Sequence, residues 1–206
     1  MSQARAWLRA LGLVVLVALS VTGIATPALA QNAEPTRDMG YGRPDAPVTV
    51  IEYISLTCPV CARFHAETLP HVLKTYVEPG HVRLILRDYP LDGMALQAAV
   101  VARCMGSNER FTAFVNLLFQ RQLQWADSRD PLAEIGRLAR IAGMAPEQFS
   151  ACLRNQSLAE SVLRERQSAE TEFRVRSTPT FVINGRVVPS FLSAAQFDEL
   201  VKPLIK

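Results

Sequence analysis

The chain has 206 residues, of which 49% are hydrophobic, which is enough for one folded domain with a full core. Its 22 Lys and Arg residues are nearly balanced by 19 Asp and Glu residues. A nucleic-acid-binding domain carries a basic face or stripe, so this balance argues against that class of protein. It gives no support to binding at a membrane surface either.

The N-terminal segment has the three parts of a secretory signal peptide. Arg5 and Arg9 supply positive charge, and residues 11–19 form an apolar run without a charged side chain. The segment closes on Ala28-Leu29-Ala30, the small-x-small pattern of a cleavage site. The alternative is an uncleaved membrane anchor, although the apolar run is short of the roughly 20 residues that span a bilayer. We therefore expect residues 1–30 to be a signal peptide.

The next elements follow a strand–helix–strand order. Residues 31–43 are polar and contain glycine and proline, which predicts an irregular leader. Residues 48–54 are mostly apolar and β-branched, as in a buried strand of a parallel sheet. A helix is predicted over residues 59–76, and a second strand over residues 82–89. Such a βαβ unit is right-handed.

Residues 94–175 have helical periodicity and no convincing strand. Asp130-Pro131 is typical of an N-cap followed by proline at the first helical position, and Ala145-Pro146 predicts the start of another helix. The apolar stripes in this region indicate the core of a helical subdomain.

Strand character returns at residues 180–183, and Asn184-Gly185 predicts a hairpin into residues 186–188. A capping-box pattern then opens a last helix at Ser193. The order βαβ, helices, ββα predicts an α/β thioredoxin fold over residues 44–206, with a helical insertion at about 94–175.

Cys58-Pro59-Val60-Cys61 stands where the first strand passes into the helix. Pro59 suits the first helical position, which places Cys58 at the N-cap beside unpaired backbone N–H groups. The partial positive charge of a helix N-terminus favours a thiolate, so Cys58 is predicted to be the attacking cysteine. Cys61, one turn later, is predicted to be the resolving one.

Three other interpretations of this motif are possible. A CxxC can be half of a zinc site, and His65 could add a third ligand, but the chain has no second CxxC or closely spaced histidine pair. Haem attachment needs histidine directly after the second cysteine, where this chain has Ala62. A purely structural disulfide is the third possibility. We adopt a redox-active pair.

Four features of the chain occur together: Asp45-Ala46-Pro47 before a strand, the CPVC motif, the inserted helices, and Ser177-Thr178-Pro179-Thr180 before the hairpin. With them the chain resembles, from about Gly42 to its C-terminus, the DsbA-like branch of the thioredoxin superfamily. The CPVC helix start joined to a Thr-Pro-Thr-Phe segment, in this strand order, is highly specific.

The resemblance assigns roles to three further residues. Pro179 matches the family's cis-proline, which lies beside the CxxC and presents the preceding backbone to an extended substrate; a trans proline that starts a strand is the alternative. Thr178 matches the residue that contacts the active-site sulfurs. Glu52 matches a buried acid that relays protons to the resolving cysteine. A carboxylate in an apolar strand independently needs a reason, unless it lies at an exposed strand end.

One departure concerns the residue before Cys61. Strongly oxidising members usually have histidine there, and Val60 gives the thiolate neither positive charge nor an imidazole hydrogen bond. The direction of electron flow is therefore less secure than the chemistry. Tyr53, Val60 and Phe64 could line an apolar rim for unfolded clients or belong to the core.

Cys104 and Cys152 fall in the helical insertion, both on apolar faces. They could be two buried free thiols, or a structural disulfide, which some relatives carry there and which export would allow to persist.

The resulting hypothesis is an exported, periplasmic thiol–disulfide oxidoreductase that forms disulfides in folding client proteins. The family implies a membrane quinone-linked partner that reoxidises it. The alternatives are a periplasmic reductase or isomerase, and a binding module whose cysteines are only structural.

Overall fold

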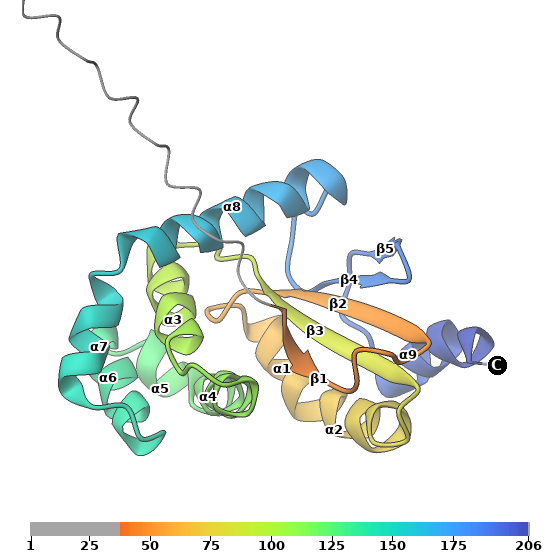
Figure 1. The fold of residues 1–206 in the computed structure, drawn as a ribbon, viewed down its shortest axis with the longest axis horizontal. Coiled ribbons are helices and arrows are strands. Elements are labelled where there is room, and N and C mark those ends of the chain that lie inside the picture. The colour runs from red at the N-terminus through yellow and green to blue at the C-terminus, as the bar shows by residue number, and fades with distance from the viewer. Residues whose placement is uncertain (1–37, 206) are drawn as a thin grey trace, which may run out of the picture. The chain divides into compact units, whose positions relative to one another are not determined.

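The computed structural model describes residues 38–205, so the predicted signal peptide and most of the leader lie outside the described residues. Its centre is a five-stranded sheet of order β1-β3-β2-β4-β5 (Figure 1). β2 and β3 are parallel, and the other neighbours are antiparallel. The mixed α/β fold is the predicted one. The strands are β1 (Met39–Tyr41), β2 (Val48–Ile54), β3 (Val82–Asp88), β4 (Thr180–Ile183) and β5 (Arg186–Val188).

β1 corrects the sequence analysis, which expected residues 31–43 to be irregular. Its three residues pair with β3, and Tyr41 lies opposite Leu84. The Asn108 side chain accepts a hydrogen bond from the Gly40 N–H at 2.7 Å and donates one to the Gly40 carbonyl at 2.9 Å. A Cβ at Gly40 would collide with the Leu84 carbonyl oxygen. Glycine permits this close approach but hides the strand pattern in the sequence.

The helix predicted over residues 59–76 is divided into three pieces. α1 (Pro59–Glu67) is followed by α2 (Leu69–Val72) and a π-helical turn, η1 (Leu73–Val77). The break falls at Thr68, two residues before Pro70, because a proline inside a helix removes one N–H donor and crowds the preceding turn. At this break, the Thr68 hydroxyl donates a hydrogen bond to the Leu192 carbonyl oxygen at 2.8 Å.

Six helices follow β3 and precede β4, as the sequence predicts for the insertion. Figure 1 shows α3 to α7 gathered beyond one end of the sheet, with α8 running from them back over it. Cys104, after α3, forms a disulfide with Cys152 on α7. The inserted helices are α3 (Gly93–Arg103), α4 (Asn108–Gln120), α5 (Gln122–Ala126), α6 (Pro131–Ile141), α7 (Pro146–Leu153) and α8 (Gln156–Glu172).

The last helix, α9 (Ala194–Val201), begins with the predicted capping box between Ser193 and Gln196. A 3-10 turn, η2 (Lys202–Leu204), follows it. Leu204, at the end of η2, is an exposed apolar residue.

Side chains on β2 alternate between two cores, because successive residues of a strand point to opposite faces. Val50 and Ile54 belong to the larger core, which includes residues of α1, α9 and the inserted helices. Ile51 and Tyr53 belong to a smaller core under α8. Glu52 lies between Val50 and Ile54 in the alternation, so its side chain faces the larger core and α1.

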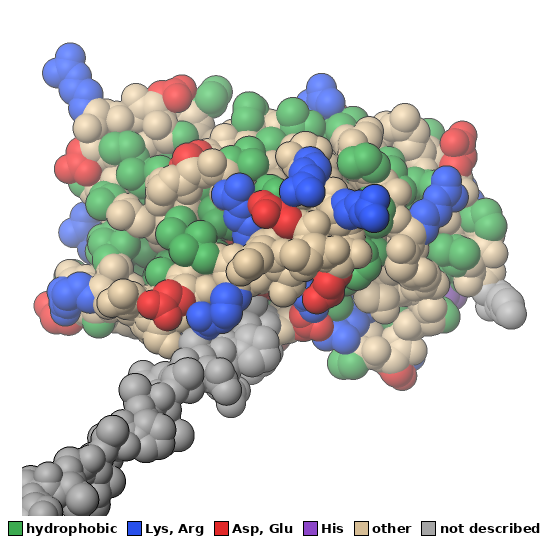
Figure 2. Space-filling view, turned by 90° about the horizontal axis from the view of Figure 1, so that it is seen from above, with side chains coloured by type: hydrophobic (Ala, Val, Ile, Leu, Met, Phe, Trp, Pro, Cys, Tyr) green, Lys and Arg blue, Asp and Glu red, His purple; other side chains and the backbone are tan. Residues whose placement is uncertain are grey.

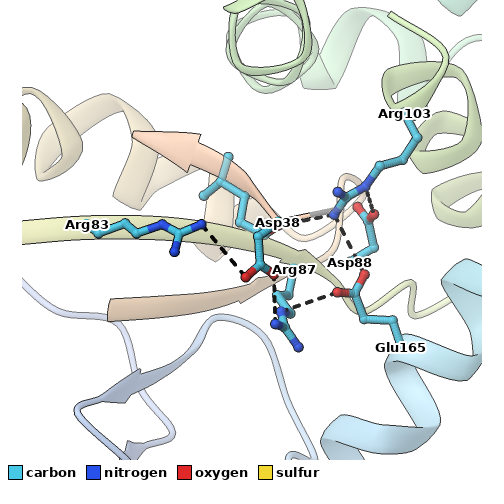
Figure 3. Close-up of polar contacts among 7 residues, drawn as sticks. Asp38, Arg83, Arg87, Asp88, Arg103 and Glu165 are labelled. Carbon is cyan, nitrogen blue, oxygen red and sulfur yellow. Dashed lines mark hydrogen bonds and ion pairs between the residues drawn. The ribbon is translucent and has the colours of Figure 1, made fainter. Parts of the chain in front are cut away.

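A network of ion pairs, buried at Arg103 and Asp88 and partly exposed at Asp38, ties the inserted helices to the sheet (Figure 3). Arg103 of α3 bonds to Asp88 at the end of β3, with 2.6 Å between Nε and Oδ2. Glu165 of α8 bridges Arg103 and Arg87, and Arg87 reaches Asp38 at 2.7 Å. Arg103 and Asp88 are almost fully buried, so each charge depends on the other.

Figure 2 views the molecule from the α8 side, where Lys and Arg side chains lie beside Asp and Glu side chains. On α8 itself, Arg164 pairs with Glu160 and Arg166 with Glu170, one turn apart. Such pairs are typical of a solvated helix face. Within residues 38–205, no helix is long and apolar enough to cross a membrane.

Candidate active site

Cys58 is the N-cap residue of α1, with extended backbone at φ −79° and ψ 117°, and Pro59 is the first helical residue. As a thiol, the Cys58 side chain makes no capping hydrogen bond with the backbone N–H groups of α1. Cys58 and Cys61 are both free and both buried. The local geometry is the one that the sequence predicts for the pair, because proline fixes the start of the helix directly after Cys58.

The two thiols have opposite acidities. The pKa of Cys58 is lowered to about 5, chiefly because the Cys61 thiol hydrogen-bonds to it. Burial opposes this shift, and the Thr178 side chain and the backbone N–H groups of Cys61 and Val60 add to it. The pKa of Cys61 is raised well above its ordinary value by burial, then by its hydrogen bond to Cys58 and the charge of Glu52. Cys58 is therefore suited to attack, and to leave, as a thiolate.

The segment before β4 closes the site from the other side. The Thr178–Pro179 peptide bond is cis, the geometry that the resemblance implies. The Thr178 carbonyl oxygen accepts a hydrogen bond from the Cys58 thiol at 3.3 Å. The Thr178 hydroxyl is buried and makes no hydrogen bond while Cys58 is a thiol, so it can donate to Cys58 when the sulfur ionises.

Glu52 lies behind the pair and is fully buried, so the alternative of an exposed strand end is wrong. Neither carboxylate oxygen makes a hydrogen bond. His65 Nε2 lies 3.3 Å from Glu52 Oε2, in an orientation that forms no aligned hydrogen bond. The charge of Glu52 contributes to the raised pKa of Cys61, which links the carboxylate to that thiol.

The sequence offers His65 as a possible third zinc ligand beside the CxxC motif. In the structure, both nitrogens of its ring face protein side chains. Nε2 faces Glu52, and Nδ1 lies 3.0 Å from Asn116 Oδ1. Asn116 in turn donates to the Tyr41 hydroxyl at 2.8 Å. Among residues 38–205, no group of three or more His, Cys, Asp or Glu side chains is arranged to hold a metal ion.

Val60 is 37% exposed beside Cys58, whereas Tyr53 and Phe64 are core residues. Gln122, at the start of α5, is a site residue that the sequence did not predict. Its buried amide donates to the carbonyl oxygens of Leu56 and Cys58, at 2.8 and 3.0 Å. It holds the loop before α1 against the inserted helices, and no local pattern marks a glutamine for that contact.

Cys104 and Cys152 form a disulfide in the insertion, with their Cα atoms 6.2 Å apart. Their pairing leaves Cys58 and Cys61 as the free dithiol among the described residues.

The fold and the site together define a thioredoxin-fold protein with a CxxC dithiol at a helix N-terminus. Residues 34–203 match the family described as Thioredoxin, and the chain belongs to that family. The crystal structure of Wolbachia pipientis alpha-DsbA1 is similar, with a TM-score of 0.77 and 24% sequence identity. The similarity covers 83% of this chain and 92% of that one, so the fold is of the DsbA-like type.

Two relatives are similar in sequence. A Rickettsia felis protein named "Putative protein-disulfide oxidoreductase" is 32% identical over 151 residues, covering 72% of this chain and 53% of its own length. The chain thus spans about half the length of this relative. Disulfide bond formation protein D of Bacillus subtilis is 25% identical over 169 residues, covering 80% of this chain and 74% of that protein.

Proposed function

We propose that this protein is an exported thiol–disulfide oxidoreductase that introduces disulfides into client proteins through Cys58 and Cys61. One observation carries the proposal: the pKa of Cys58 is lowered to about 5 while that of its neighbour Cys61 is raised. A low-pKa thiolate stabilises the reduced form, and a stabilised reduced form makes the disulfide form an oxidant.

The reaction starts from the Cys58–Cys61 disulfide. A client thiolate attacks Cys58 Sγ, the Cys58–Cys61 bond breaks, and the electron pair stays on Cys61 Sγ, which takes up a proton. A second client thiolate then attacks the client sulfur of the mixed disulfide, and Cys58 leaves as a thiolate. The client loses two electrons and the enzyme gains them. The raised pKa of Cys61 supports this order, because it favours the Cys61 sulfur that takes up the proton, whereas the lowered pKa of Cys58 favours its departure as a thiolate.

Export rests on the sequence of residues 1–30, which we propose to be a cleaved signal peptide that delivers residues 44–206, the thioredoxin-like domain with its insertion, to the periplasm. The Cys104–Cys152 pair supports an oxidising compartment. The names of the Rickettsia and Bacillus relatives support the reaction class. For regeneration we propose a membrane quinone-linked partner, as in the DsbA-like family. We propose no metal or organic cofactor.

Val60 favours a second candidate function. Its exposed apolar side chain gives the Cys58 thiolate no positive charge or hydrogen bond. A less stabilised thiolate lowers the reduction potential toward that of reductases, so a periplasmic disulfide reductase is the alternative.

The test compares both directions of electron flow in the same preparation. Oxidised protein is mixed with a reduced, unfolded client, and disulfide formation is followed by thiol titration; reduced protein is mixed with insulin, and precipitation of the reduced chains is followed. We expect efficient client oxidation, and a reduction potential against glutathione clearly less negative than the roughly −270 mV of thioredoxin and more negative than the roughly −120 mV of DsbA. A potential near that of thioredoxin, with insulin reduction much faster than client oxidation, selects the reductase. Absence of exchange in both directions selects a binding module.

A further inference from the structure

The buried position of Cys61 creates a proton-transfer problem that Cys58 does not have. In each catalytic cycle Cys61 takes up a proton when the enzyme disulfide is reduced and loses it when the disulfide re-forms. Its side chain is 0% exposed, and so is the Glu52 carboxylate that interacts with it. Since proton exchange with water needs a route, a third group has to connect this pair with solvent.

The fold places His65 on that route. Cys61 and His65 are four residues apart on α1 and therefore lie on the same side of the helix, one turn from each other. Glu52 points toward α1 because it shares a face of β2 with Val50 and Ile54. His65 Nε2 is 3.3 Å from Glu52 Oε2. Neither oxygen of Glu52 nor Nε2 of His65 has a hydrogen-bond partner, so a proton between them has no competing acceptor.

The other side of His65 leads out of the core. The imidazole lines a cavity of about 420 Å³ between α1, α2 and α4, together with Ala62, Leu69, Asn116, Phe119 and Gln120. A volume of this size holds several water molecules, and the Asn116 and Gln120 amides offer them polar partners. Asn116 also fixes the ring, through the contact between its Oδ1 and His65 Nδ1.

Glu52 interacts with three titratable side chains: Cys61 and His65 from α1, and Tyr41 from β1. Burial raises the pKa of Tyr41 to about 12, so its hydroxyl keeps its proton at the pH at which thiols exchange. The Tyr41–Asn116 end of the chain of contacts therefore positions His65 and does not carry the proton away.

We propose that His65 is a positioning residue that transfers the proton of Cys61 between Glu52 and water in the cavity behind α1. The inference rests on the dithiol exchange of the proposed function. On reduction of the enzyme, the Cys61 thiolate takes a proton from the Glu52 carboxyl, and Glu52 takes one from His65 Nε2. The ring takes its replacement at Nδ1, the nitrogen on the side of Asn116 and the cavity, from solvent through the cavity water. Reoxidation moves the same proton outward, so that Cys61 becomes a thiolate and attacks the mixed disulfide at Cys58.

The test separates the two steps of oxidation of the reduced enzyme by oxidised glutathione. Cys58 first forms a mixed disulfide, and Cys61 then displaces glutathione; both steps are resolved by acid quenching and mass spectrometry. We expect His65→Gln to slow the second step about tenfold or more at pH 7, as for loss of a proton-transfer group, and to leave the first step unchanged. His81→Gln is the matched control, because His81 lies just before β3 and away from Glu52. The rates of both steps in this variant should equal those of wild type.

Two further variants distinguish proton transfer from a structural effect. In His65→Ala the removed ring extends the cavity, and added imidazole should restore most of the lost second-step rate. In a Glu52→Gln background, His65→Gln should cause no further slowing, because His65 acts through Glu52.

The inference is overturned if the second step of His65→Gln stays within about twofold of wild type, or if imidazole leaves His65→Ala unchanged. It is also overturned if the two substitutions slow the second step independently. These results are distinct from failure of the proposed function, in which the wild-type protein itself would form no disulfide with oxidised glutathione.

Discussion

The Cys58 thiol donates a hydrogen bond of 3.3 Å to the carbonyl oxygen of Thr178, a residue 120 positions away in the sequence. A thiol can make this bond and a thiolate cannot, because the thiolate has no proton to donate. When Cys58 ionises it becomes an acceptor, and the donors that lower its pKa are the Cys61 thiol, the Thr178 side chain and two backbone N–H groups. Cys58 thus donates a hydrogen bond to the Thr178 carbonyl oxygen as a thiol, and accepts one from the Thr178 side chain as a thiolate.

The first prediction concerns this ionisation. The absorbance of the reduced protein at 240 nm, which reports thiolate, should rise with a midpoint near pH 5. Thr178→Val should move the midpoint upward, because it removes one donor to the thiolate. Cys58→Ser should abolish the rise below pH 8. A midpoint of wild type near the ordinary thiol value of about 8.5 contradicts the prediction.

The same shift sets a pH dependence of stability. Because the pKa of Cys58 is lower in the folded state than in the unfolded one, its contribution to stability is present above the unfolded value of about 8.5 and is lost as pH falls through about 5. The pKa of Cys61 is raised in the folded state. Its contribution to stability is therefore present below the pKa of the unfolded state and is lost only as pH rises through the higher folded pKa. The difference in the free energy of unfolding between reduced wild type and Cys58→Ser, measured in urea, should therefore grow from pH 5 to pH 8.

Trapping of clients should depend on which cysteine is replaced. Cys61→Ser should accumulate mixed disulfides with client proteins, because the attacking thiolate of Cys58 remains and the resolving thiol is gone. Cys58→Ser should trap none, since Cys61 is buried and its pKa is raised. Non-reducing gels of exported protein decide between the two. Equal trapping by both variants would reverse or remove the assigned roles.

Val60→His should make the protein a stronger oxidant. Val60 is exposed and lies one residue before Cys61, where an imidazole can approach the Cys58 thiolate and stabilise the reduced form. The reduction potential against glutathione should become less negative, and every 30 mV corresponds to about 1.4 kcal/mol. Val60→Leu, which keeps the apolar character, is the control and should stay near wild type. A potential that falls or does not move in Val60→His refutes the assignment.

The Cys104–Cys152 disulfide is predicted to act on stability alone. It joins residues 48 positions apart, and closing a loop of that length is worth about 4 kcal/mol in the chain-entropy estimate. The double substitution Cys104→Ala/Cys152→Ala should lower the urea midpoint accordingly, while glutathione exchange at Cys58 keeps its wild-type rate. A loss of exchange without loss of stability would show that the pair takes part in the chemistry.

The buried ion pair of Figure 3 should matter more than an exposed one. Arg103→Ala leaves Asp88 buried without its closest cation and should cost about 3–5 kcal/mol of unfolding free energy. Arg137→Ala removes an exposed helix pair with Glu134 and should cost less than about 1 kcal/mol. Thermal or urea unfolding of the two variants gives the comparison, and similar losses in both would contradict the role of the network.

Local features of the chain were predictable from the sequence. Cys58 as N-cap with Pro59 behind it, the Asp130 and Ser193 caps, and the Asn184-Gly185 hairpin each depend on groups a few residues apart. Their physical cause, the unpaired N–H groups of a helix start or the twist of a tight turn, is present in the local sequence. The order of elements from β2 onward along the chain was also predictable, because the apolar periodicity of each segment distinguishes strands from helices.

Tertiary structure decided the contacts between distant elements. The strand β1 exists because Asn108 and β3 supply its partners, and the break at Thr68 is completed by a bond to Leu192. The sequence marked Glu52 as an acid that needed a partner, but it did not mark His65 as that partner. Their contact depends on the facing surfaces of β2 and α1, and the free energy that brings those surfaces together comes from burying the apolar side chains around them.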